Sequence, residues 1–243
     1  MIKISCTNQS TVITDAEFQQ AMINIQTQAN RDFAPLWGTD QVQMTFLPKT
    51  SPVPVGNYQM VCCDDSDQAG ALGYHETTEN GDPIGFFFAK TDQQYGESWT
   101  VTFSHEILEM IGDPFINTVI IVTNADNSLS LYAFEASDAV EADALGYQIN
   151  GTLVSDFVTP YWFNPLETGR QYDYQKKCTS PLQLLPDGYI GMMSATSPGG
   201  WTQVTANRMS QHAMDKAIPQ PFHRRHRRQM GRRQWRQSKK QAA

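Results

Sequence analysis

Apolar and polar positions alternate in some segments of the chain and recur with a helical period in others. Alternation, or a short apolar run bounded by turn residues, is typical of a strand, because successive side chains point to opposite faces. On this basis the first half of the chain is predicted to contain five strands, at residues 2–6, 42–47, 58–63, 71–75 and 84–89. Gly81, in the turn sequence Glu-Asn-Gly-Asp, joins the last two.

Two segments of the first half follow the helical period instead. Thr14 and Asp15 are good N-terminal caps for a helix over residues 16–30, in which Phe18, Met22 and Ile25 share one face. The stretch from Trp99 is apolar on most sides, which predicts a buried helix that Gly-Asp-Pro at 112–114 ends. Residues 1–112 are therefore expected in the order strand, helix, four strands, helix.

The second half reads as strands and loops. Segments 118–123 and 128–134 flank the turn sequence Asn-Ala-Asp-Asn, and segments 147–149 and 152–158 flank Asn150-Gly151, a strong hairpin signal. Residues 166–205 are rich in loop residues. We expect an α+β domain over residues 1–215, divided into subdomains at 1–114 and 115–215.

Charge divides the chain near residue 215. Residues 1–215 carry 8 Lys and Arg and all 25 Asp and Glu, a net charge of −17, whereas residues 216–243 carry 10 Lys and Arg and no acid. So basic a segment cannot build a core and is expected to be a disordered tail. No stretch has the apolar length of a membrane span, and the N-terminus lacks a signal-peptide pattern. The expected location is cytoplasmic or virion-associated.

The basic tail predicts an anionic partner, with nucleic acid first and an acidic membrane surface or the chain's own acidic body as alternatives. Arginine side chains bind phosphate without reading base sequence, and Trp235 can stack on a base. The arginines expected to contact nucleic acid are Arg224, Arg225, Arg227, Arg228, Arg232 and Arg233.

Chemistry is concentrated in the second helix, where residues 105–109 read His-Glu-Ile-Leu-Glu. Residues four apart lie on one helix face, so His105 and Glu109 can hold one metal ion. Glu106 is then placed to act as general base toward a metal-bound water. Charged groups are costly to bury unless they have partners, and this favours a metal or a water-filled cleft over an ordinary helix surface.

The motif His105-Glu106-x-x-Glu109 resembles the His-Glu-x-x-His motif of zincin metallopeptidases, with glutamate in place of the last histidine. The resemblance implies a zincin-like fold, in which a twisted mixed sheet backs the active-site helix and its border strand pairs with substrate. In gluzincins the third ligand is a glutamate after that helix. This implies that Glu135 is the third ligand and that Asp138 orients His105.

The roles of Glu135 and Asp138 are interchangeable on this evidence, and Glu141 is a further candidate for the third ligand. The three acids would share one face if the segment were helical. A second comparison is with the metzincins: Gly112 falls where their glycine falls, but Phe115 replaces their last ligand. Met192-Met193 resembles their Met-turn.

His75 lies on a strand before the helix, and its simplest interpretation is a partly exposed histidine without a role. The functional interpretation is that Tyr74 or His75 stabilises an oxyanion. One imidazole with two carboxylates makes a harder donor set than the zincin one. Zinc is the expected metal, with Mn²⁺ or Ca²⁺ as alternatives. The predicted function is a metal-dependent hydrolase, a peptidase acting on peptides or proteins. The alternative is a non-catalytic, zincin-like structural or virion-associated protein whose tail binds nucleic acid.

Overall fold

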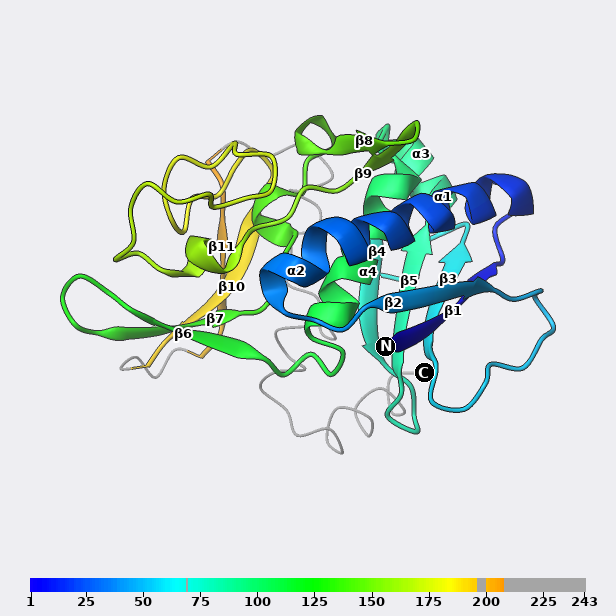
Figure 1. The fold of residues 1–243 in the computed structure, drawn as a ribbon, viewed down its shortest axis with the longest axis horizontal. Helices are drawn as coiled ribbons and strands as arrows, with labels where there is room; N and C mark the ends of the chain where they lie inside the picture. The colour runs from blue at the N-terminus through cyan, green and yellow to red at the C-terminus, as the bar shows by residue number, and fades with distance from the viewer. Residues whose placement is uncertain (69, 196–199, 208–243) are drawn as a thin grey trace.

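A computed structural model describes residues 1–68, 70–195 and 200–207 (Figure 1). The predicted tail lies outside these residues, and so do the six arginines that the sequence predicts to contact nucleic acid. The described chain is a mixed α/β structure with several sheets. Within the same residues, no helix has both the length and the apolar character needed to cross a bilayer.

A five-stranded sheet forms the framework of the first half, with the order β2-β1-β3-β5-β4. Neighbouring strands are parallel except β4, which pairs antiparallel with β5 and lies at the edge. The predicted strands and their order along the chain are confirmed. Their observed bounds are β1 Ile2–Asn8, β2 Val42–Phe46, β3 Tyr58–Cys63, β4 Gly73–Thr77 and β5 Pro83–Phe88.

Helix α1 (Asp15–Gln28) begins as predicted. The Thr14 side chain accepts a hydrogen bond from the Glu17 amide, and the Glu17 carboxylate accepts one from the Thr14 amide. This reciprocal cap satisfies two backbone donors that a helix start leaves open. The predicted end at residue 30 differs, because the helix continues through a π-turn (Ala29–Phe33) into α2 (Ala34–Trp37).

Helix α4 (Trp99–Gly112) follows the short α3 (Ala89–Tyr95), which sequence patterning did not predict. Every residue of α4 from 101 to 111 is buried. Phe18 of α1 and Phe103 of α4 both stack near Phe87 of β5, with ring centroids 6.1 and 4.6 Å away. Both helices therefore pack on the same face of the sheet, with α1 crossing in front of it in Figure 1.

Glycine at position 73 brings α4 close to the edge strand β4. A Cβ atom at Gly73 would lie 2.8 Å from Glu106 Cγ and from Thr102 Cγ2 of the helix. Only a residue without a side chain permits this approach. The acidic face of α4 is thereby held against β4.

The second half is built mainly from antiparallel strands, as predicted. A four-stranded sheet has the order β11-β10-β7-β6, and β8 pairs with β9 through the Asn150-Gly151 turn, where both residues have positive φ. A second hydrophobic cluster surrounds the buried Trp162. The elements are β6 Val119–Thr123, β7 Leu129–Ala133, β8 Tyr147–Ile149, β9 Thr152–Val154, β10 Tyr189–Ser194, β11 Thr202–Thr205, and the 3-10 helices η2 Asp138–Val140, η3 Asp143–Leu145 and η4 Pro160–Phe163.

Candidate metal centre

Helix α4 directs its three predicted functional side chains into the interior. His105, Glu106 and Glu109 are all buried. One helical turn separates His105 from Glu109, and the Nε2 atom of His105 lies 3.2 Å from Oε1 of Glu109. The amide of Ser137, from the segment after β7, donates a hydrogen bond to the same oxygen at 3.2 Å.

Asp138, the first residue of η2, completes a group around His105. Its Oδ1 atom lies 3.1 Å from His105 Nε2 and accepts a hydrogen bond of 2.6 Å from the Tyr189 hydroxyl of β10. One ligand atom each from His105, Glu109 and Asp138 lies within 4.8 Å of the other two. These three side chains can hold a metal ion.

The electrostatics at His105 are those of a cation position. Burial by itself would lower the pKa of this histidine. The charge of Glu109, with hydrogen bonds to Asp138 and Glu109, outweighs burial and raises the pKa well above its ordinary value. The nearby carboxylates therefore stabilise a positive charge at His105. A divalent cation is also positive, and imidazole and carboxylate groups are ligands that such cations accept.

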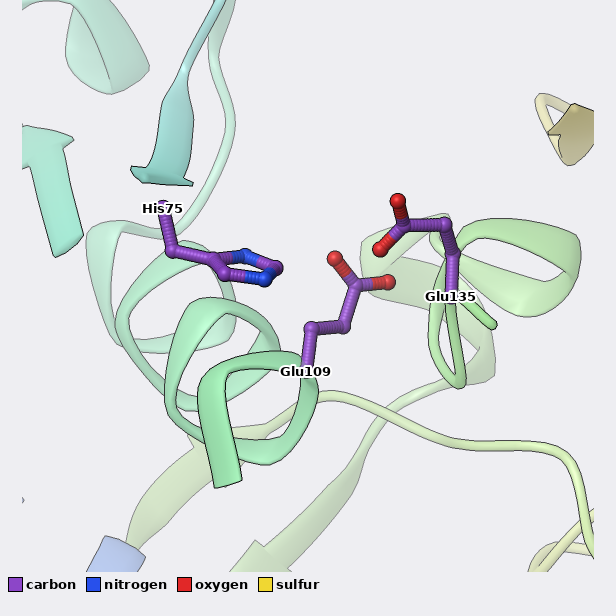
Figure 2. A group of neighbouring side chains, drawn as sticks. All are labelled: His75, Glu109 and Glu135. Atoms are coloured by element: carbon purple, nitrogen blue, oxygen red, sulfur yellow. The ribbon is translucent and has the colours of Figure 1, made fainter. Parts of the chain in front are cut away.

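Glu135 lies in the same region but belongs to a different group. It follows β7 in a segment that is not helical, so Glu135, Asp138 and Glu141 do not share a helix face as the spacing suggested. Its carboxylate gathers instead with Glu109 and with His75 of β4, again with ligand atoms within 4.8 Å (Figure 2). Glu109 is thus common to two buried groups.

His75 differs from its sequence interpretation as a partly exposed strand residue, since it is only 1 % exposed. Its Nδ1 atom lies 3.3 Å from Glu106 Oε2, and its Nε2 atom lies 3.2 Å from the backbone carbonyl of Asp113. The burial comes from the packing of α4 over β4. In the sequence, only Gly73 two positions earlier on the strand hinted at such a close approach.

Glu106 points toward β4 and lines a small pocket together with His105. The pocket offers about 30 Å³ to water, and its walls come from β4, α4 and the turn at 141–143. This volume accepts one or two water molecules. The pocket therefore has room for water between a proton acceptor, Glu106, and the candidate metal ligand His105.

Acidic side chains form the outer part of this pocket, namely Glu97, Glu141, Asp143 and Asp187. Burial, together with the charges of the other three, raises the pKa of Glu97 to about 7. Glu141 thus lies at the pocket wall, and among the described residues it is in neither of the two groups around Glu109.

The remaining comparison with the metzincins concerns Met192 and Met193. Both lie on strand β10, which pairs with β7 and β11, and Met192 packs against the second hydrophobic cluster. Phe115, at the position of the last metzincin ligand, is partly exposed. Neither observation adds a ligand to the groups around Glu109.

No protein family model, no curated protein and no solved structure matches this chain. The chemistry of the site is therefore inferred from its own residues.

Proposed function

We propose that the chain is a metal-dependent hydrolase of zincin-like design, in which His105, Glu109 and Asp138 hold a divalent cation and Glu106 is the general base. The observation that carries the proposal is the buried His105–Glu109–Asp138 group beside a water-sized pocket that Glu106 also lines. Asp138 takes the ligand role that the resemblance gave to Glu135, an exchange that the sequence left open.

The donor set fits a metal ion. It combines one imidazole with two carboxylates. Ser137, whose amide donates to Glu109, also has a buried hydroxyl without a hydrogen-bond partner among the described residues. Zinc accepts nitrogen and oxygen ligands, and two carboxylates also suit Mn²⁺ or Ca²⁺. A bound ion would supply a polarised, more acidic water.

The protein's own residues would prepare the rest of the reaction. Tyr189 fixes Asp138 through its 2.6 Å hydrogen bond, which leaves the carboxylate directed at His105. His75 holds the Glu106 carboxylate from β4. Glu106 would take the proton of the attacking water and return it to the leaving group.

Peptides are the substrate class that the architecture favours. β4 is the last strand of the sheet among the described residues, and α4 packs against it, so the pocket with Glu106 lies beside an edge strand. An extended peptide can add to such an edge through its backbone hydrogen bonds. This matches the zincin arrangement, in which the border strand pairs with substrate.

The test compares metal content and hydrolysis in matched variants. Glu106→Gln should keep the metal and lose hydrolysis of an unstructured protein by about 10²-fold or more, because it removes the proton acceptor alone. His105→Ala should lose hydrolysis and the ion at His105, and Glu79→Gln, in an exposed turn, should lose neither. Full activity in Glu106→Gln would remove Glu106 from the mechanism. Equal, near-zero metal in wild type and His105→Ala would overturn the metal site.

A non-catalytic role is the second candidate, and the basic segment 216–243 is what favours it. There the zincin-like body would be structural or virion-associated, and the tail would bind nucleic acid. This candidate predicts metal binding at His105 without hydrolysis under any metal. Activity that depends on Glu106 decides against it.

A further inference from the structure

We propose that the chain binds a second divalent cation at His75, Glu109 and Glu135, and that the Glu109 carboxylate bridges it to the ion at His105. The proposal rests on the proposed function only through the shared Glu109. It converts a single-ion site into a dinuclear centre.

The three side chains converge from separate parts of the chain. His75 comes from β4, Glu109 from α4 and Glu135 from the segment after β7, and their exposed fractions are 1 %, 0 % and 2 %. Figure 2 shows the imidazole and both carboxyl groups pointing toward one another. Three segments far apart in sequence thus place metal-ligating atoms within 4.8 Å in the protein interior.

Charge supports a cation at this point. The two groups together contain three carboxylates and two imidazoles, all buried. Buried carboxylates are stabilised by nearby positive charge, and a divalent cation bound within the cluster would add it.

The contacts of His75 are compatible with a role as a metal ligand. Both ring nitrogens lie near oxygen atoms: Nδ1 near Glu106 Oε2 and Nε2 near the Asp113 carbonyl. A neutral ring donates from one nitrogen only, so the lone pair of the other would face an oxygen. Donation from Nδ1 to Glu106 leaves a lone pair on Nε2, which a bound ion would take in place of the unfavourable contact with the Asp113 carbonyl. Histidine ligands commonly donate their second N–H to a carboxylate.

The shared residue explains the departure from the zincin motif. Glu109 stands where that motif has histidine, and its two oxygens can each bind a different ion. A neutral imidazole offers one lone pair and binds one ion. Hydrolases with two ions about 3.5–4 Å apart use such centres to hold both the attacking and the leaving oxygen. Glutamate at position 109 is therefore the substitution that a dinuclear centre requires.

The experiment counts tightly bound Mn²⁺ on the full chain, after equilibrium dialysis, by elemental analysis and electron paramagnetic resonance. Wild type should bind two ions per chain, with a resonance signal broadened by coupling between neighbouring ions. His75→Ala should bind one ion with an uncoupled signal. His75→Gln, which keeps a polar side chain, is the second variant, and circular dichroism confirms that each is folded. Asp82→Asn, in an exposed turn, is the control and should still bind two.

The outcomes separate this proposal from the previous one. One ion in wild type and one in folded His75→Gln would overturn the second site and leave the first intact. Two ions in both would place the second ion elsewhere and also overturn it. No ion in wild type would overturn both sites. Two ions in wild type, one in His75→Gln and one in His105→Ala is the result that the dinuclear centre predicts.

Discussion

Glu109 is the residue on which both candidate ion positions depend. It is fully buried, lies 3.2 Å from His105 and is held by the Ser137 amide. A carboxylate here lowers the Lewis acidity of an ion at His105, compared with a site built from two imidazoles, because it adds negative charge. In exchange, it gives the neighbouring group of His75 and Glu135 a shared ligand.

Substitution of Glu109 by histidine tests both effects of the carboxylate, on the ion at His105 and on the shared ligand. Glu109→His restores the His-Glu-x-x-His set and should bind zinc more tightly than wild type, because imidazole suits zinc. The number of bound ions should fall from two to one, because the bridge is lost. Competition with a chromophoric zinc chelator measures the affinity, and elemental analysis measures the count. Weaker zinc binding would mean that residue 109 is not a ligand or that the pocket accepts only a carboxylate.

At the scale of elements, most of the framework could be predicted because burial imposes a period on the sequence. Strand alternation located the central sheet, and the capping residues Thr14 and Asp15 located the start of α1, where the structure adds Glu17 to the cap. The π-turn after α1 and the short α3 could not be predicted, since four to seven residues carry too little pattern. The strand order also depends on contacts between distant segments, which periodicity does not encode.

The candidate site was predicted only where its spacing is local. His105, Glu106 and Glu109 share one helix, so their relation follows from helical geometry. The roles of Glu135 and Asp138 depend on a non-helical turn after β7, and helix spacing is the wrong guide there. His75 joins the centre through the packing of two elements, and the sequence around it contains no sign of that packing beyond Gly73.

The long connection after β9 is anchored by a pair of buried carboxyl groups. Asp156 accepts hydrogen bonds from the amides of Phe157 and Gln175, and Asp173 accepts them from Lys177 and Cys178. Burial, followed by the hydrogen bond and charge of Asp173, raises the pKa of Asp156 to about 9. Asp156 is therefore protonated at neutral pH and donates toward Asp173.

This pair makes stability depend on pH. An acid whose pKa is raised on folding stabilises the protein fully below its ordinary pKa near 4, and that contribution is lost as pH rises through about 9. In Asp156→Asn the side-chain oxygen still accepts both hydrogen bonds. The side-chain NH2 group donates to Asp173 and does not titrate. Its free energy of unfolding, relative to wild type, should rise between pH 5 and 8 by up to ~1.4 kcal/mol per pH unit.

Denaturant unfolding of both proteins across this range measures the difference, and contributions from other titrating groups cancel between them. Asp82→Asn, in an exposed turn, is the control and should run parallel to wild type at every pH. Parallel curves for Asp156→Asn as well would show that Asp156 is ionised in the folded protein, contrary to the expected sign.

For the whole molecule, the dominant feature is the separation of charge along the chain. The centre lies where the two halves meet, with His75 and Glu109 from the first half and Glu135 and Asp138 from the second. Acids are concentrated in this body, whereas residues 216–243 carry only positive charge. A body of net charge −17 repels nucleic acid, so any binding of nucleic acid must come from the tail.

Binding through the tail should be independent of base sequence and steeply dependent on salt, because it releases counterions from phosphate. Deletion of residues 219–243 should abolish it while metal content and thermal stability stay unchanged.

Replacing the six arginines, Arg224, Arg225, Arg227, Arg228, Arg232 and Arg233, by glutamine should reduce the slope of log affinity against log salt by about five. Replacing the same six by lysine is the matched control and should preserve most of the slope. Fluorescence anisotropy with random-sequence duplexes, from about 50 to 200 mM salt, measures each slope. Over that range, six to ten phosphate contacts lose about 10³–10⁵ in affinity. Binding that survives the deletion would place the anion site on the body, and a loss of stability on deletion would make the tail a clasp on the acidic surface.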